Sequence, residues 1–168
     1  MIICKNVEGP LEAESSRWTM FLCLMALLSL SLVVQAEPSR VVPAEGILKK
    51  IELGQPVEYD NCTIVGDMNI SKLELPKIFV ARTSWENEYF SLTDNAKLVV
   101  SPIEITGCLI LGSLNLKGTV LQENLTCENS KFEGFVDLAG THFLQAADFR
   151  RTQFNQTASF WFALSTPG

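Results

Sequence analysis

Histidine is almost absent from this chain, and basic residues are few. Among the 168 residues there is one histidine, His142, so a metal site with several histidine ligands is excluded and no second histidine can serve as a catalytic base. The chain has 13 basic and 19 acidic side chains. This net charge of -6 argues against nucleic acid as a partner, because phosphate binding needs clustered basic residues.

Cysteine is also too scarce for a disulfide framework. Cys4 and Cys23 lie in the first 36 residues, and Cys62, Cys108 and Cys127 are spread over the rest. Three is an odd number, and we expect these three to be buried as small apolar residues. Four N-x-Ser/Thr sequons, which are either glycosylation sites or chance matches, begin at Asn61, Asn69, Asn124 and Asn155.

One long apolar run lies near the start of the chain. Residues 20–34 read MFLCLMALLSLSLVV and Ala36 follows, which is typical of a signal peptide (residues 1–36) cleaved after Ala36. The run is shorter than the roughly 20 residues of a membrane span. Two basic and three acidic residues precede it, unlike the usual positive start, so three alternatives stay open: a start at Met20, an uncleaved anchor over residues 18–34, and a cytoplasmic protein. The pattern predicts a secreted or extracytoplasmic protein, with membrane attachment only if the segment is uncleaved.

From residue 105 onward, large apolar residues recur with alternating steps of five and six. This predicted inward column consists of Ile105, Ile110, Leu116, Leu121, Cys127, Phe132, Leu138, Phe143, Phe149, Phe154 and Phe160. The residue two positions before each member is small or aliphatic, and the residue between them is mostly polar. On an α-helix these steps would place apolar residues on opposite sides. In extended chain, residues two apart share a face, so the pattern predicts an all-β solenoid of short strands separated by turns.

The same pattern occurs earlier in the chain. Residues 56–75 align with residues 102–121 at an offset of 46, and six of the 20 pairs are identical, among them Cys62/Cys108 and Gly66/Gly112. Every predicted inward position has an inward partner. A repeated structural unit is therefore expected.

These residues resemble the pentapeptide-repeat family, whose unit is roughly A-(D/N)-(L/F)-x-x. Residues 147–151 (ADFRR) and 152–156 (TQFNQ) are the closest copies, and the resemblance covers residues 56–75 and 102–162. It implies a right-handed quadrilateral β-helix with four short strands per coil. One residue is added in every second unit, so a coil takes about 22 residues rather than 20.

The segments outside the repeats complete the predicted organisation. Residues 37–55 are expected to form an N-terminal cap with a short helix over Ala44–Ile51, ended by Gly54. The predicted β-helix spans residues 56–162, and residues 76–101 form an insert that breaks the pattern. The pattern ends after Phe160, so either residues 161–164 fold over the last coil or the chain is a truncated fragment. Residues 163–168 are a C-terminal tail.

The insert carries aromatic residues among acidic ones, which suggests either a partner contact or a cover for the solenoid flank. Trp85, Tyr89 and Phe90 are the candidate contact residues. We find no phosphate-binding loop and no metal-ligand spacing, and His142 lies between two inward positions and should face solvent. No catalytic, cofactor-binding or metal-binding residue is predicted, and the protein is not expected to be an enzyme.

Two functions remain. The first is a non-catalytic exported scaffold or protein-interaction module whose partner is an unknown protein or cell-surface component. The second follows from the family resemblance, since some pentapeptide-repeat proteins imitate duplex DNA and bind topoisomerases. Residues 105–160 hold five acidic and four basic side chains, which is too close to neutral for a DNA mimic, and an exported protein would not meet a topoisomerase.

Overall fold

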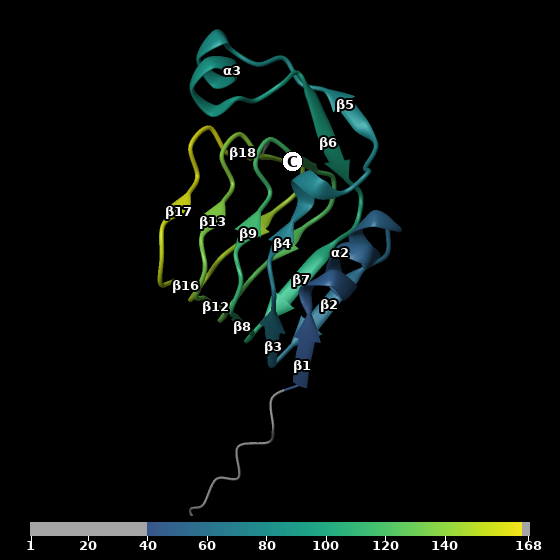
Figure 1. The fold of residues 1–168 in the computed structure, drawn as a ribbon, viewed down its shortest axis with the longest axis vertical. Helices are drawn as coiled ribbons and strands as arrows, with labels where there is room; N and C mark the ends of the chain where they lie inside the picture. The colour runs from purple at the N-terminus through teal and green to yellow at the C-terminus, as the bar shows by residue number, and fades with distance from the viewer. Residues whose placement is uncertain (1–39, 166–168) are drawn as a thin grey trace, which may run out of the picture. The chain divides into compact units, whose positions relative to one another are not determined.

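The structure is a computed structural model that describes residues 40–165. The predicted signal segment, with Cys4 and Cys23, and the last three residues of the predicted tail lie outside the described residues. The described part is mostly β, with stacked parallel sheets and two α-helices, and it is compatible with an all-β solenoid (Figure 1). Within residues 40–165, no helix is long and apolar enough to cross a membrane.

The strands form four sheets, which the chain visits in the same order in successive coils. Sheet 1 contains β2 (Val57–Asp60), β7 (Ile103–Thr106), β11 (Leu125–Thr126) and β15 (Ala147–Asp148). Sheet 2 contains β1 (Arg40–Pro43), β3 (Cys62–Val65), β8 (Leu109–Ile110), β12 (Lys131–Phe132) and β16 (Gln153–Phe154). Sheet 3 contains β4 (Met68–Asn69), β9 (Leu114–Asn115), β13 (Val136–Asp137) and β17 (Ala158–Ser159). Sheet 4 contains β5 (Lys77–Phe79), β6 (Asn95–Val99), β10 (Val120–Leu121), β14 (His142–Phe143) and β18 (Leu164–Ser165).

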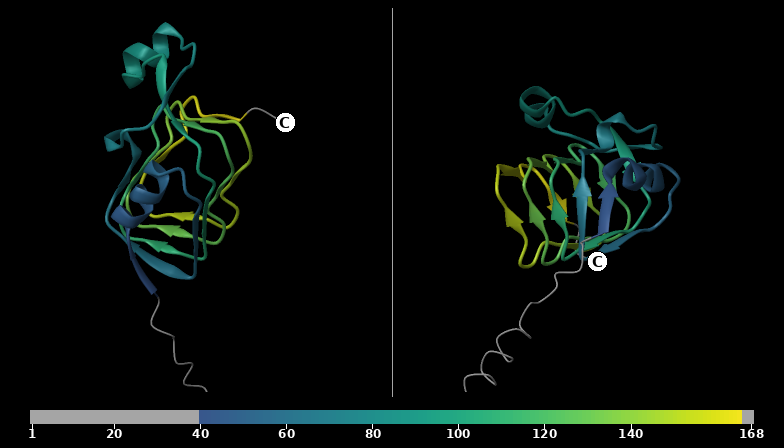
Figure 2. Two further views of the ribbon diagram at one scale, coloured as in Figure 1. Left: turned by 90° about the vertical axis from the view of Figure 1, so that its right-hand side faces the viewer. Right: turned by 60° about the horizontal axis from the view of Figure 1, so that its bottom comes forward.

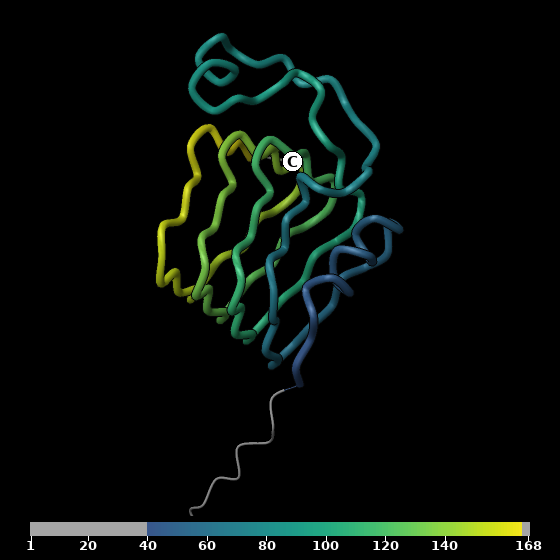
Figure 3. Tube along the Cα trace, viewed as in Figure 1, coloured from purple at the N-terminus to yellow at the C-terminus, as the bar shows by residue number. Residues whose placement is uncertain are grey.

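The strand register matches the spacing in the sequence. Ile103 pairs with Leu125, which pairs with Ala147, so these coils have the length that four alternating steps of five and six predict. Val57 pairs with Ile103 and Asn69 with Asn115, which is the register that the offset of 46 predicts. The tube in Figure 3 shows the successive coils lying side by side.

Helix α2 (Ala44–Glu52) covers one end of the stack. Ala44, Ile47 and Ile51 are its buried residues, and they belong to the same apolar cluster as the interior of the coils. Gly54, at φ +66°, ends the helix in a left-handed turn where its N–H bonds to the Ile51 carbonyl. Figure 2 shows α2 at the end of the stack opposite the yellow C-terminal coil. A helix at this position is what the spacing of apolar residues predicts.

Strand β1, which precedes α2, has no counterpart in the sequence predictions. It pairs with β3 in parallel, Arg40 opposite Cys62, and so extends sheet 2 by one strand at the α2 end. The two paired residues are again separated by the length of one coil. The segment before the helix therefore belongs to the stack.

The predicted inward column lies in the core over most of its length. Its first eight members, from Ile105 to Phe143, are buried. Phe149 and Phe154 are partly buried, and Phe160 is 43% exposed, which differs from the inward position expected for it. These last three belong to the final described coil, against whose outer side no other described coil packs. Their rings contact one another, with the Phe149 and Phe160 centroids 5.7 Å apart.

Polar residues of the repeats stabilise the turns between strands. The side-chain oxygens of Asn115, Asp137 and Asp148 each accept a hydrogen bond from the backbone N–H two residues ahead, at 3.0 Å. On the inner side, the Thr119 and Thr141 hydroxyls both donate to the Leu116 carbonyl. Buried carbonyls at the corners thus have partners, which explains why small hydroxyl residues alternate with aliphatic ones.

Two boundaries predicted from the sequence differ from the structure. The sequence predicts that the insert extends to residue 101, but β6 already belongs to the stack, because it pairs with β10 and places Val99 opposite Leu121. In the alignment at an offset of 46, Leu75 is the counterpart of Leu121. In the structure the residue opposite Leu121 is instead Val99, which is fully buried. At the other end, the pattern does not stop after Phe160. Strand β18 pairs with β14 and places Ser165 opposite Phe143, so the coil continues although the residue is polar.

Candidate functional site

Helix α3 (Ser84–Phe90) presents the candidate contact residues of the insert. Thr83 begins the helix with a capping box: its hydroxyl accepts the Glu86 N–H, and the Glu86 carboxylate accepts the Thr83 N–H at 2.8 Å. Ser91 ends it in the left-handed conformation. These bonds, with the arginine described next, hold the pKa of Glu86 below its usual value. Glu86 is therefore a structural carboxylate that is charged at neutral pH.

A buried arginine fastens the insert to the stack. The side chain of Arg82 is fully buried and lies 3.4 Å from the Glu86 carboxylate. Its guanidinium also donates to the Thr93 carbonyl within the insert and to the Gly118 carbonyl at a corner of the stack. Because a buried guanidinium needs several acceptors, this set of bonds fixes the insert against the corner between sheets 3 and 4.

That corner is formed by residues at equivalent positions of successive coils. Gly118, Gly140 and Phe162 have φ values of +65°, +64° and +54°, so each makes the same left-handed turn. A Cβ on Gly118 or Gly140 would lie within 3 Å of a Leu92 side-chain carbon. The insert therefore packs directly on the two glycines. At the third position the chain carries a phenylalanine, whose ring meets Phe90 edge-on at 5.5 Å.

The aromatic residues at this place form what we call the aromatic patch: Trp85, Tyr89, Phe90, Trp161 and Phe162. Trp85 and Tyr89 stack on each other with centroids 4.1 Å apart and planes 13° apart. Both are about three-fifths exposed, as is Trp161, at 60%, 61% and 66%. The patch lines a hollow of about 240 Å³. Large aromatic surface exposed in one place is uncommon on a protein that binds nothing.

The sequence identifies three members of the aromatic patch and misses two. Trp85, Tyr89 and Phe90 come together as neighbours on α3, whereas Trp161 and Phe162 arrive from the final described coil. The sequence does contain a signal that could identify Phe162. It lies one coil after Gly140, and this spacing places it at the corner that the insert covers. The Phe90–Phe162 contact itself depends on how far the insert extends along the stack.

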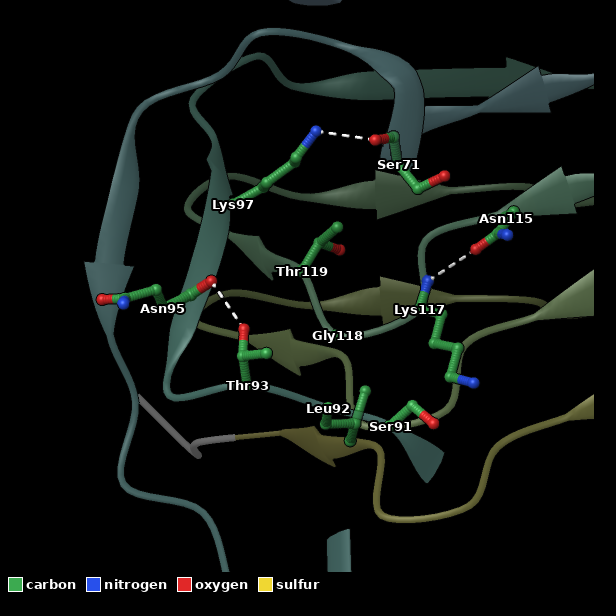
Figure 4. Close-up of a pocket in the computed structure, with 10 residues that line it drawn as sticks. All are labelled: Ser71, Ser91, Leu92, Thr93, Asn95, Lys97, Asn115, Lys117, Gly118 and Thr119. Carbon is green, nitrogen blue, oxygen red and sulfur yellow. Dashed lines mark hydrogen bonds between the residues drawn. The ribbon is translucent and has the colours of Figure 1, made fainter. Parts of the chain in front are cut away.

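A second, polar hollow of about 330 Å³ lies between the insert and the stack (Figure 4). Ser71, Thr93, Asn95 and Asn115 contribute hydroxyl and amide groups to it. The Lys97 amine donates to the carbonyls of Ser71 and Leu73, so this cation is engaged by the backbone. The groove offers hydrogen-bonding groups but presents no nucleophile paired with a base among the residues that line it.

The sequence predicts that His142 faces solvent, but in the structure its side chain is partly covered. Its Nε2 atom is buried and has no hydrogen-bond partner among the described residues. Desolvation, and to a smaller extent the positive charge of Arg82, hold the pKa of His142 below its usual value, while Glu86 acts in the opposite direction. The imidazole is thus neutral at pH 7 and lies near the polar contacts of the insert.

Acidification is expected to weaken the fold through His142. A lowered pKa in the folded state means that the unfolded state binds the proton more readily, so stability falls as the pH drops below about 6.5. The free energy of unfolding in urea should fall between pH 7.5 and pH 5.5. In His142→Leu, which cannot take up the proton, this fall should be smaller. An equal fall in both proteins would show that another group is responsible.

Some of the remaining ionisable groups form ion pairs on the surface, and the Cys127 thiol is buried. Arg150 pairs with Asp148 at 2.7 Å and with Glu128 at 3.2 Å. Burial raises the pKa of Cys127 to about 12. Within residues 40–165, no group of three or more His, Cys, Asp or Glu side chains is placed to hold a metal ion.

Comparisons of the chain with models of protein families, with curated proteins and with solved structures gave no match.

Proposed function

We propose that this chain is a non-catalytic, exported scaffold of the pentapeptide-repeat type, folded as a right-handed quadrilateral β-helix, that binds a protein or cell-surface component through its aromatic patch. The four-sided form is supported by the four sheets, which successive coils of equal length visit in a fixed order. In this proposal the stack is a rigid support. The insert and the last described coil carry the recognition residues.

The observation that carries the proposal is the exposure of the aromatic patch. Buried Trp, Tyr and Phe contribute strongly to protein interfaces, and Trp and Tyr are enriched among residues that dominate binding energy. In this structure Trp85, Tyr89 and Trp161 keep more than half of their surface in solvent. If the insert served only to cover the flank of the solenoid, these rings would be expected to face the stack.

The backbone at Phe162 supports the same proposal. A bulky residue at φ +54° is strained by about 1–2 kcal/mol, whereas Gly118 and Gly140 make the same turn without a Cβ. The ring contact with Phe90 recovers about 1 kcal/mol of this strain, and burial of part of the ring offsets more of it, since 42% of the Phe162 surface is exposed. Phenylalanine is therefore tolerated at this turn. The exposed part of its ring is available to a partner.

Phe162→Gly separates binding from stability. Removing the ring relieves the turn but loses the contact with Phe90 and the buried area of the ring, so the free energy of unfolding should fall by no more than about 2 kcal/mol. Capture of components from the native cell envelope by the immobilised protein should weaken about tenfold or more. Proteins and polysaccharides are assayed separately, which distinguishes the two kinds of partner.

Two further variants complete this experiment. The double variant Trp85→Ala/Tyr89→Ala should also lose capture, whereas Phe135→Ala, which removes an exposed ring outside the aromatic patch, should not. A lower melting temperature with capture unchanged in Trp85→Ala/Tyr89→Ala would instead assign the rings a purely structural role. The proposal would then be wrong about the binding surface.

A further inference from the structure

Two cysteines of successive coils meet inside the stack. Cys62 is the first residue of β3, and Cys108 immediately precedes β8. The next residues, Thr63 and Leu109, are paired in parallel register. The two Sγ atoms lie 3.0 Å apart, about 1 Å more than a disulfide bond, and both residues are buried. Residues in register on adjacent strands are about 4.8 Å apart, which falls within the range of Cα separations that disulfides span.

At the equivalent positions of the later coils there are serine and threonine residues whose hydroxyls form hydrogen bonds with the backbone. Ser130, one coil after Cys108, donates to the Ile105 carbonyl and accepts the Cys108 N–H at 3.1 Å. Thr152, one coil further on, donates to the Cys127 carbonyl at 2.7 Å. A thiol is a weaker hydrogen-bond donor than a hydroxyl. The Cys108 thiol makes similar contacts, accepting the Cys62 N–H at 3.4 Å and donating to the Thr106 carbonyl at 3.2 Å. The Cys62 thiol has no such role, because among the described residues its contact is with the Cys108 thiol.

We infer that Cys62 and Cys108 form a disulfide when the chain folds in the presence of a thiol-disulfide oxidant such as oxidised glutathione. One cysteine thiolate attacks a glutathione sulfur and releases the first glutathione thiolate. The second cysteine thiolate then attacks the protein sulfur of the mixed disulfide and releases the second. Both protein protons end on the two glutathione thiols, and the two electrons lost by the cysteines reduce the oxidant.

The exchange must precede closure of the coil. In the folded state burial, followed by the contact with Cys108, raises the pKa of Cys62 to about 12, so its thiol is protonated and enclosed. During folding the thiols are still accessible, and strand pairing then brings them together. The disulfide is accordingly expected in protein refolded with oxidant and to form slowly in protein that is already folded.

The bond would enclose the whole insert. Cys62 and Cys108 are 46 residues apart, whereas equivalent residues of later coils, such as Cys108 and Ser130, are 22 apart. The additional residues between the two cysteines are those of the insert, including α3. Closing a loop of this length in the unfolded chain stabilises the fold, and a rise in melting temperature of about 10 °C is expected. The first coil would then remain closed even while the insert opens.

The test refolds the full chain from denaturant with reduced and oxidised glutathione, blocks free thiols, and maps the cysteine-containing peptides by mass spectrometry. We expect a Cys62–Cys108 linkage, a free Cys127, and a melting temperature about 10 °C above that of the reduced protein. Cys127→Ala should keep the linkage and the shift. Cys62→Ala should lose both.

Blocked, unlinked Cys62 and Cys108 after refolding would overturn the inference, as would a dominant linkage through Cys127 or a cysteine of the first 36 residues. Because the variants of the aromatic patch leave both thiols in place, partner capture and the disulfide can fail independently. The two proposals are therefore tested separately.

Discussion

Gly112→Ala is expected to reduce the free energy of unfolding by more than about 4 kcal/mol, or to prevent folding. A Cβ at Gly112 would lie 2.0 Å from the Gly66 carbonyl oxygen and 2.4 Å from its carbon. At the next coil, a Cβ on Gly134 would lie 2.6 Å from the Gly112 carbonyl carbon and oxygen. Three glycines thus stack backbone against backbone at the corner between sheets 2 and 3.

The clash at Gly112 cannot be relieved by moving a side chain, because the obstructing atoms are backbone. Shifting them would stretch the hydrogen bonds on either side, from Leu111 N–H to the Ile64 carbonyl and from Met68 N–H to the Ser113 carbonyl. Urea denaturation measures the loss. Gly46→Ala is the matched control, since nothing lies within 4 Å of that Cβ in α2, and it should stabilise the protein by about 0.5–1 kcal/mol. Equal midpoints for Gly112→Ala and the unmodified protein would contradict the stacked-glycine corner.

Phe132→Ala is expected to cost about 3–5 kcal/mol of unfolding free energy. Phe132 is fully buried in sheet 2 and its ring stacks on that of Phe154, with centroids 5.5 Å apart and planes 16° apart. Truncation leaves a cavity in the middle of the stack, between coils whose backbones are held by strand pairing and cannot collapse into it. The loss should also loosen Phe154, which packs against Phe149 and Phe160.

Phe135→Ala provides the comparison for Phe132→Ala. Phe135 lies three residues further on and is 57% exposed, so its truncation should change the free energy of unfolding by less than about 0.5 kcal/mol. Both variants lose the same atoms. Similar losses in urea denaturation would show that Phe132 is not in the core.

Much of the fold can be predicted from the sequence, because each coil repeats the same chemistry. Alternation of apolar and polar residues defines the strands, and the offset of 46 gives the register between β2 and β7. Strand β1 is missed because a single strand of four residues carries no repeat of its own. Leu75 is misassigned because it and Val99 are both buried aliphatic residues, and local pattern cannot tell which of them continues the coil.

The candidate site is predicted less completely, since it depends on contacts between distant segments. Trp85, Tyr89 and Phe90 are close in sequence and share α3, so their association follows from local structure. Phe162 joins them through a tertiary contact between the insert and the final described coil. The environment of His142 likewise depends on Arg82 and Glu86, which the insert brings to sheet 4. Because His142 lies between two inward residues, the pattern predicts that its side chain points outward. The pattern does not predict that the insert covers this side chain.

The position of the insert changes how this stack can come apart. In a simple solenoid each coil touches only its neighbours, so terminal coils can fray without affecting the others. Here the insert leaves the first coil, packs on the corners at Gly118 and Gly140, and reaches Phe162 in the fourth. Opening of the fourth coil therefore removes a contact made by the first. Opening of these two coils becomes linked, and the four described coils are expected to unfold as one cooperative unit.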